Sequence, residues 1–115
     1  MKLEGPGKCV TVFIGETDHW HHKPLYAAIV ERAREMGLAG ATVTRGIMGF
    51  GAHSRMHTAS ILRLSEDLPI VIQIVDVPER IDAFLPLLDE MVSEGMVMTW
   101  DVVIERYVHH EKNQD

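Results

Sequence analysis

The sequence predicts an α+β fold in which a four-stranded antiparallel sheet has two helices on one face. Four segments rich in β-branched and other apolar residues have the composition of buried strands. Two further segments place apolar residues at helical spacing, and each begins at a proline and closes at a glycine. The resulting order is β-α-β-β-α-β, which right-handed crossovers close into one sheet.

The first half of the chain supplies a strand, a loop and a helix. Residues 9–14 form an apolar run that predicts the first strand, and residues 15–22 form a polar loop. Pro24 suits the first turn of a helix, where its missing N–H costs nothing, and Gly37 suits the left-handed residue after the helix. The apolar residues at helical spacing are Leu25, Ala28, Ile29, Ala33 and Met36.

The middle of the chain predicts a second strand and a long connection. Residues 41–48 have strand composition, and three glycines at positions 46, 49 and 51 gather at the end of this strand. Residues 49–67 lack a regular pattern and are interpreted as the connection to the next strand. Connections longer than about 12 residues inside a compact domain are usually functional or disordered.

The second half repeats the strand, helix and strand pattern. Residues 68–75 predict the third strand and residues 97–108 the fourth. Pro78 begins the second helix, and Gly95 ends it. Pro86 should kink this helix or separate its first turn. Its apolar stripe consists of Ile81, Phe84, Leu85, Leu88, Met91 and Val92.

The 115 residues suit one domain, which is expected over residues 9–108. Residues 1–8 contain two glycines and a proline and predict a flexible N-terminal lead, and residues 109–115 predict a polar C-terminal tail. The N-terminus has no apolar signal core, and no segment reaches the length of a membrane span. We therefore expect a cytoplasmic protein.

Charge and cysteine usage exclude several classes of protein. The formal net charge of -6 argues against a nucleic-acid partner, because such binding depends mostly on phosphate neutralisation. Cys9 is the single cysteine, so a disulfide framework and a cysteine-based zinc site within one chain are excluded. Its apolar surroundings predict a buried structural thiol.

The first and third strands predict an oligomer. Residues 9–14 and 68–75 are apolar at both alternating sets of positions, so both faces of the sheet need cover. Two helices can cover only one face. The simplest cover for the other face is the sheet of another subunit.

Three segments give a resemblance to a known family. They are the glycine-rich GATVTRGIMGFG at 40–51, VFIGE at 12–16 with KPLY at 23–26, and DLPIVI at 67–72 with IVD at 74–76. With these segments the chain resembles, over residues 9–108, the PII-like proteins of domain-of-unknown-function family one hundred and ninety. The resemblance implies a ferredoxin-like fold, a homotrimer and kinship with the nitrogen-regulatory PII proteins.

The resemblance also implies a function. PII proteins bind adenine nucleotides between subunits and engage membrane transporters or enzymes through a long loop after the second strand, here residues 49–64. It therefore implies an AMP, ADP or ATP ligand, no required cofactor, and a transporter or channel partner. The phosphate-binding loop of PII proteins contains glycines and lysines. This chain has SEGMVMT at residues 93–99 in that place, with an acid and no lysine.

The glycine-rich segment is the first candidate site. Glycines allow a ligand to approach the backbone closely, arginines can bind phosphate, and an aromatic ring can stack on a base. The alternative is a strand end with a bulge and a tight turn. The expected nucleotide-binding residues are Arg45, Gly46, Gly49, Phe50, Gly51 and Arg55.

A histidine-rich loop is the second candidate site. His19, His21 and His22 lie beside Glu16 and Asp18, and imidazole and carboxylate groups bind zinc, nickel or copper. The alternative functional hypothesis is therefore a metal-binding or metal-tolerance trimer. The non-functional interpretation of this segment is a solvated polar loop. No nucleophile, base and orienting group stand out together, so we do not expect an enzyme.

Overall fold

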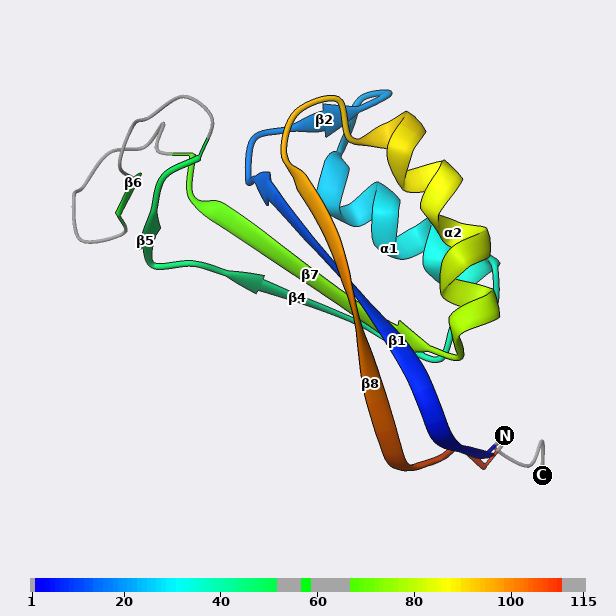
Figure 1. Ribbon diagram of the computed structural model, residues 1–115. Helices are drawn as coiled ribbons and strands as arrows, with labels where there is room; N and C mark the ends of the chain where they lie inside the picture. The colour runs from blue at the N-terminus through cyan, green and yellow to red at the C-terminus, as the bar shows by residue number, and fades with distance from the viewer. Residues whose placement is uncertain (1, 52–56, 59–66, 111–115) are drawn as a thin grey trace.

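The expected four-stranded antiparallel sheet is present, with the strand order β4-β7-β1-β8 (Figure 1). The computed structural model describes residues 2–51, 57–58 and 67–110. Both helices lie on the same face of the sheet (Figure 1). These features confirm the ferredoxin-like prediction. The elements of this layer are β1 (Lys2–Gly15), α1 (Leu25–Glu35), β4 (Ala41–Arg45), β7 (Pro69–Asp76), α2 (Pro78–Met91) and β8 (Met96–Val108).

Two small hairpins accompany the main sheet. One pairs β2 (His19–Trp20) with β3 (Lys23–Pro24), and the other pairs β5 (Met48–Gly49) with β6 (His57–Thr58). The β2–β3 hairpin precedes α1, whereas β5 and β6 lie well away from both helices (Figure 1). No helix in the described ranges is both long and apolar enough to cross a membrane.

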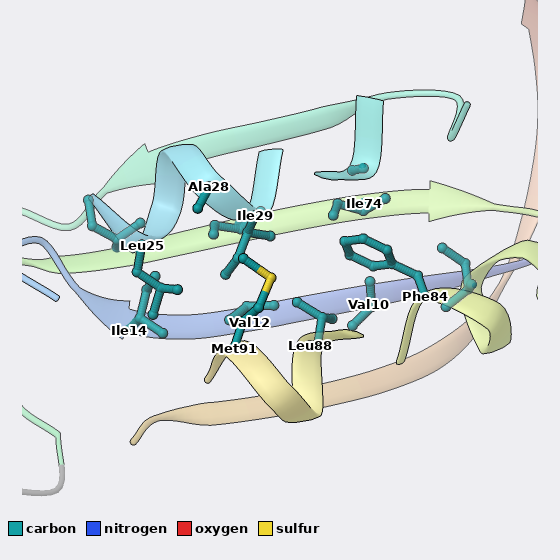
Figure 2. Close-up of a cluster of buried hydrophobic side chains, with 14 residues drawn as sticks. Val10, Val12, Ile14, Leu25, Ala28, Ile29, Ile74, Phe84, Leu88 and Met91 are labelled. Atoms are coloured by element: carbon teal, nitrogen blue, oxygen red, sulfur yellow. The ribbon is translucent and has the colours of Figure 1, made fainter. Parts of the chain in front are cut away.

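The core lies between the helices and one face of the sheet. Alternate residues of β1 and β7 point toward α1 and α2, as Figure 2 shows for Val10, Val12 and Ile74. Phe84 and Leu88 of α2 are completely buried against them. The helical stripes predicted from spacing therefore do pack inward, apart from Met36, which is exposed at the end of α1.

Local signals explain both helices. Pro24 stands at the N-cap of α1, and Gly37 follows the helix with φ of 75°, the left-handed conformation that glycine adopts at low cost. Pro78 occupies the first turn of α2. The helix continues through Pro86 instead of separating a first turn. Pro86 is exposed, so water can bond the carbonyl that its missing N–H leaves unpaired.

The expected flexible lead at residues 1–8 is wrong for Lys2–Lys8. These residues extend β1 and pair with β8 in the register Lys2 opposite Val108 and Lys8 opposite Asp101. An irregularity at Gly5, with φ of 97°, accommodates the two glycines and the proline of this segment within the strand. The long strand β8 supplies the backbone partners. Of the expected tail, His109 and His110 follow β8, and residues 111–115 lie outside the described residues.

The second strand is shorter than the predicted range 41–48. Strand β4 ends at Arg45, and Gly46 donates its N–H to the carbonyl of Pro69 at 2.8 Å. A Cβ at Gly46 would lie 2.7 Å from the Pro69 ring. Strand β7 begins at Pro69, which has no N–H to continue the ladder, and Met48 and Gly49 belong to the separate hairpin.

The sheet face opposite the helices is apolar and uncovered in the single chain. Cys9, Thr11 and Phe13 of β1 stand opposite Trp100, Met98 and Met96 of β8. Cys9 and Thr11 are buried by their neighbours, as predicted for the thiol, whereas Trp100 and Met98 remain 38 % and 39 % exposed. The strands are thus apolar on both faces, as the sequence predicts.

Candidate functional site

A pocket of about 160 Å³ lies at the end of the sheet where β1 finishes and β8 begins. Gly15 is paired with Pro69, and Phe13 is paired with Met96, so the ends of three strands meet here. Segment 49–51 forms another part of the wall. The lining residues are Phe13, Ile14, Gly15, Asp18, Gly49, Phe50, Gly51, Asp67, Pro69, Glu94 and Gly95.

Three of the predicted site residues meet at this pocket. Gly49, Phe50 and Gly51 line it together with the end of β1, although they are far from β1 in sequence. The Phe50 side chain is 68 % exposed, so one of its faces is available to a ligand. Gly46 is not in the lining, because it packs against Pro69 as described above.

Two glycines allow the backbones to cross closely around the pocket. A Cβ at Gly95 would lie 2.5 Å from the carbonyl oxygen of Phe13, and Gly95 has φ of 145°. A Cβ at Gly15 would lie 2.5 Å from a carboxylate oxygen of Asp67. Larger residues at either position would push these neighbours away, so the glycines define the pocket's shape.

The charged part of the lining is acidic. Asp67 accepts the N–H of Thr17 through Oδ1 at 2.9 Å, and Asp18 accepts the N–H of Gly15 through Oδ2 at 2.9 Å. Both carboxylates therefore hold the turn after β1 in place. Glu94 is the third acid, and none of the described lining residues is basic.

Of the two arginines expected at the site, only Arg45 lies within the described residues. Arg45 Nη2 lies 2.7 Å from Glu16 Oε2, so this ion pair spans β7 and links the end of β4 to the loop after β1. Arg45 does not line the pocket. Arg55 lies outside the described residues.

The predicted histidine site forms the β2–β3 hairpin. His21 and His22 occupy its turn with φ of 48° and 72°, and the Trp20 and His21 rings meet edge to face with centroids 4.3 Å apart. A hydrogen bond from the Lys23 ammonium to Glu31, at 2.6 Å, raises the pKa of Lys23. Within residues 2–51, 57–58 and 67–110, no group of three or more His, Cys, Asp or Glu is placed to hold a metal ion. The metal prediction for His19, His21 and His22 therefore gains no support.

Most of the remaining lining residues were not predicted from sequence, among them the acids Asp67 and Glu94. Each of these acids lies next to a segment that the sequence does mark, since Asp67 precedes the third strand and Glu94 precedes Gly95. Their convergence on one pocket depends on strand pairing, which the sequence pattern alone does not reveal. A second, open groove of about 450 Å³ lies between α2 and β8, lined partly by Leu85, Val92 and Val97.

Comparisons with known proteins agree with this architecture. The model of DUF190, described as "Uncharacterized ACR, COG1993", matches residues 7–104. A UPF0166 protein of Aquifex aeolicus (strain VF5) is 38 % identical over 78 residues, which cover 68 % of this chain and 74 % of that protein. The UPF0166 protein MJ1524 of Methanocaldococcus jannaschii is 33 % identical over 95 residues, covering 82 % of this chain and 87 % of that protein.

A solved structure has the same fold. It is CPII, a nitrogen regulatory PII-like protein from Thiomonas intermedia K12, bound to ADP, AMP and bicarbonate. The TM-score is 0.59 at 21 % identity, with 88 % of this chain and 90 % of that chain covered. At this identity the likeness concerns the fold.

Proposed function

This chain belongs to the DUF190 family, and from that premise we propose that it is a PII-like regulatory protein that binds an adenine nucleotide. The pocket at the end of β1 is the proposed site. The fold is shared with CPII, whose structure holds ADP and AMP. The net charge and the acidic pocket are consistent with a small ligand and not with a nucleic acid.

One observation carries this proposal, namely that segment 49–51 folds against the ends of β1, β7 and β8 around a pocket. Two glycines bring the backbone to the pocket, and Phe50 offers an aromatic face on which a base can stack. Arg45 stands near the turn after β1 in an ion pair with Glu16. In the proposal it exchanges Glu16 for a ligand phosphate, and Arg55 adds to the phosphate contacts.

The proposed assembly is a homotrimer. Its support is the open sheet face, where large apolar side chains of β1 and β8 stand side by side and exposed. Monomeric proteins rarely leave contiguous apolar patches of this kind. In the proposal, sister sheets cover this face, and the nucleotide pocket lies near a junction between subunits.

The proposed output is contact with a partner through the chain that follows Gly51. Its support is the position of β5 and β6, which lie away from the helices and the core (Figure 1). Ile47 and Met48 beside the pocket are exposed apolar residues that a partner can cover. A membrane transporter or channel is the proposed partner class, as the family resemblance implies.

Thermal unfolding with added nucleotide tests the proposal. AMP, ADP or ATP should raise the melting temperature in proportion to the logarithm of its concentration above Kd, because ligands that bind only the native state stabilise it by mass action. Native mass spectrometry of the same sample should show a trimer with bound nucleotide. A trimer whose melting temperature is unchanged by all three nucleotides at millimolar concentration would contradict the proposed ligand.

A further inference from the structure

We propose that the pocket receives the base of the ligand, reads its exocyclic amino group with carboxylates, and leaves the phosphates outside. This inference rests on the proposed nucleotide function and specifies its chemistry. It follows from the size of the pocket, its apolar walls and the sign of its charge.

The size of the pocket favours a ring system over a whole nucleotide. Its volume is about 160 Å³. A protein cavity of about 150 Å³ accommodates benzene. An opening of this size can take a planar base through its mouth, whereas a ribose with phosphates must extend beyond it.

The walls suit the faces of a planar ring. Phe13, Ile14 and Pro69 contribute apolar surface at the ends of β1 and β7, and Phe50 also lines the pocket. A base can contact apolar groups on its faces while its edge remains free for hydrogen bonds. The polar groups of the lining are then the ones that form hydrogen bonds with the edge of the base.

The polar side chains of the lining are acceptors. Ionised carboxylates accept hydrogen bonds and cannot donate them, so Asp18, Asp67 and Glu94 favour a ligand edge that presents N–H groups. The same carboxylates repel phosphate. The amino group of adenine meets this requirement, whereas a phosphate does not.

Of the three carboxylates, Asp67 is the one best placed to accept a hydrogen bond from the amino group of the base. Thr17 binds Oδ1 at 2.9 Å, and Oδ2 lies so close to Gly15 that a Cβ there would approach it to 2.5 Å. The hydrogen bond from the Thr17 N–H thus holds the carboxylate next to Gly15. A carboxylate has about four lone-pair sites, so acceptor capacity remains for a ligand.

Calorimetric titration with adenosine and purine riboside tests the inference, because a hydrogen atom replaces the amino group in purine riboside. Adenosine should bind about tenfold more tightly, as expected for one hydrogen bond to a charged acceptor. The same preference should hold for AMP over purine riboside 5′-monophosphate, because the phosphate lies outside the pocket and leaves the contacts of the base unchanged.

Three variants assign the preference to residues. Asp67→Asn keeps an oxygen for Thr17 but presents an NH₂ donor, so the preference for adenosine should fall toward one. Asp18→Asn and Glu94→Gln provide the second test if Asp67→Asn unfolds. Glu90→Gln makes the same change of charge on the exposed side of α2 and should leave the preference intact.

The outcomes separate this inference from the proposed function. Equal affinity for adenosine and purine riboside, or a preference unchanged in every soluble pocket variant, would overturn amino-group reading while leaving nucleotide binding in place. An amino-group preference that is present for the nucleosides but absent for the monophosphates would overturn the placement of the phosphates. Absence of binding by adenosine, AMP, ADP and ATP alike would overturn the proposed function itself.

Discussion

At the scale of single residues, glycines determine where backbones can meet, and the sequence indicates only some of them. Gly37 is predictable because helix endings have a local signature. Gly49, Phe50 and Gly51 are also predictable as one segment, although the sequence does not show that the end of β1 faces them. The acids Asp67 and Glu94 escape prediction because only tertiary pairing brings them to the pocket.

Gly95→Ala should destabilise the protein. The residue has φ of 145°, and a Cβ would approach the Phe13 carbonyl to 2.5 Å. Strained backbone conformations cost about 1–3 kcal/mol, and the free energy of unfolding measured in urea should fall by at least this amount. At Gly40 an added Cβ meets nothing within 4 Å, so Gly40→Ala is the matched control. Equal effects of the two variants would contradict this account of the close crossing.

Phe50→Ala should weaken nucleotide binding with little loss of stability. The side chain is largely exposed and lines the pocket, so its main expected contribution is stacking on the base, worth about 1–3 kcal/mol. Titration calorimetry should therefore show at least about a tenfold increase in Kd. Ile47 is 79 % exposed and outside the lining, and Ile47→Ala should bind like the parent protein. An unchanged Kd for Phe50→Ala would exclude stacking on this ring.

At the scale of elements, helices were easier to predict than strand ends. The spacing of apolar residues and the flanking prolines and glycines are local, so both helices begin beside the predicted prolines and α1 ends beside Gly37. Helix α2 ends at Met91, four residues before the predicted Gly95. Strand ends depend on partners distant in sequence. Strand β1 extends to Lys2 because β8 is long enough to pair with it, and β4 stops at Arg45 because its partner β7 begins at Pro69.

Pro86→Ala should stabilise α2. The proline lies inside a continuous helix, where it removes one backbone hydrogen bond, and its side chain is exposed. Alanine restores the N–H without disturbing the core. Helix propensity differs by about 3 kcal/mol between the two residues, so a gain of about 1–3 kcal/mol is expected in the free energy of unfolding. Asp89→Ala, also exposed on α2, should change stability by less than about 0.5 kcal/mol. A lower stability for Pro86→Ala would mean that the proline has a role that its exposure does not indicate.

At the scale of the whole molecule, the two faces of the sheet differ in their cover. Helices protect one face, while Phe13, Met96, Met98 and Trp100 on the other remain accessible to solvent. The sequence predicts this imbalance through strands that are apolar at both alternating positions. It does not determine the geometry of the subunits that we propose to cover the open face.

Trp100→Lys should disrupt the proposed trimer. A lysine on the open face would lose hydration on assembly without gaining a partner charge, and the association constant should fall at least about 100-fold. Light scattering after size-exclusion chromatography would report the change in mass. Val103 is 70 % exposed on the same strand but on the opposite side, so Val103→Lys should leave the mass unaltered. A parent protein that stays monomeric at high concentration would contradict the trimer itself.

The pairing of Lys2 with Val108 has a consequence for engineering. The start of β1 and the end of β8 lie side by side, whereas the pocket lies at the other end of β1, beside Gly15. The start of β1 and the end of β8 can therefore be joined through a short peptide to give a circular backbone. Loop-closure entropy predicts that such a ring resists heat better than the open chain. A fluorescent reporter fused at the same place would leave the pocket unobstructed.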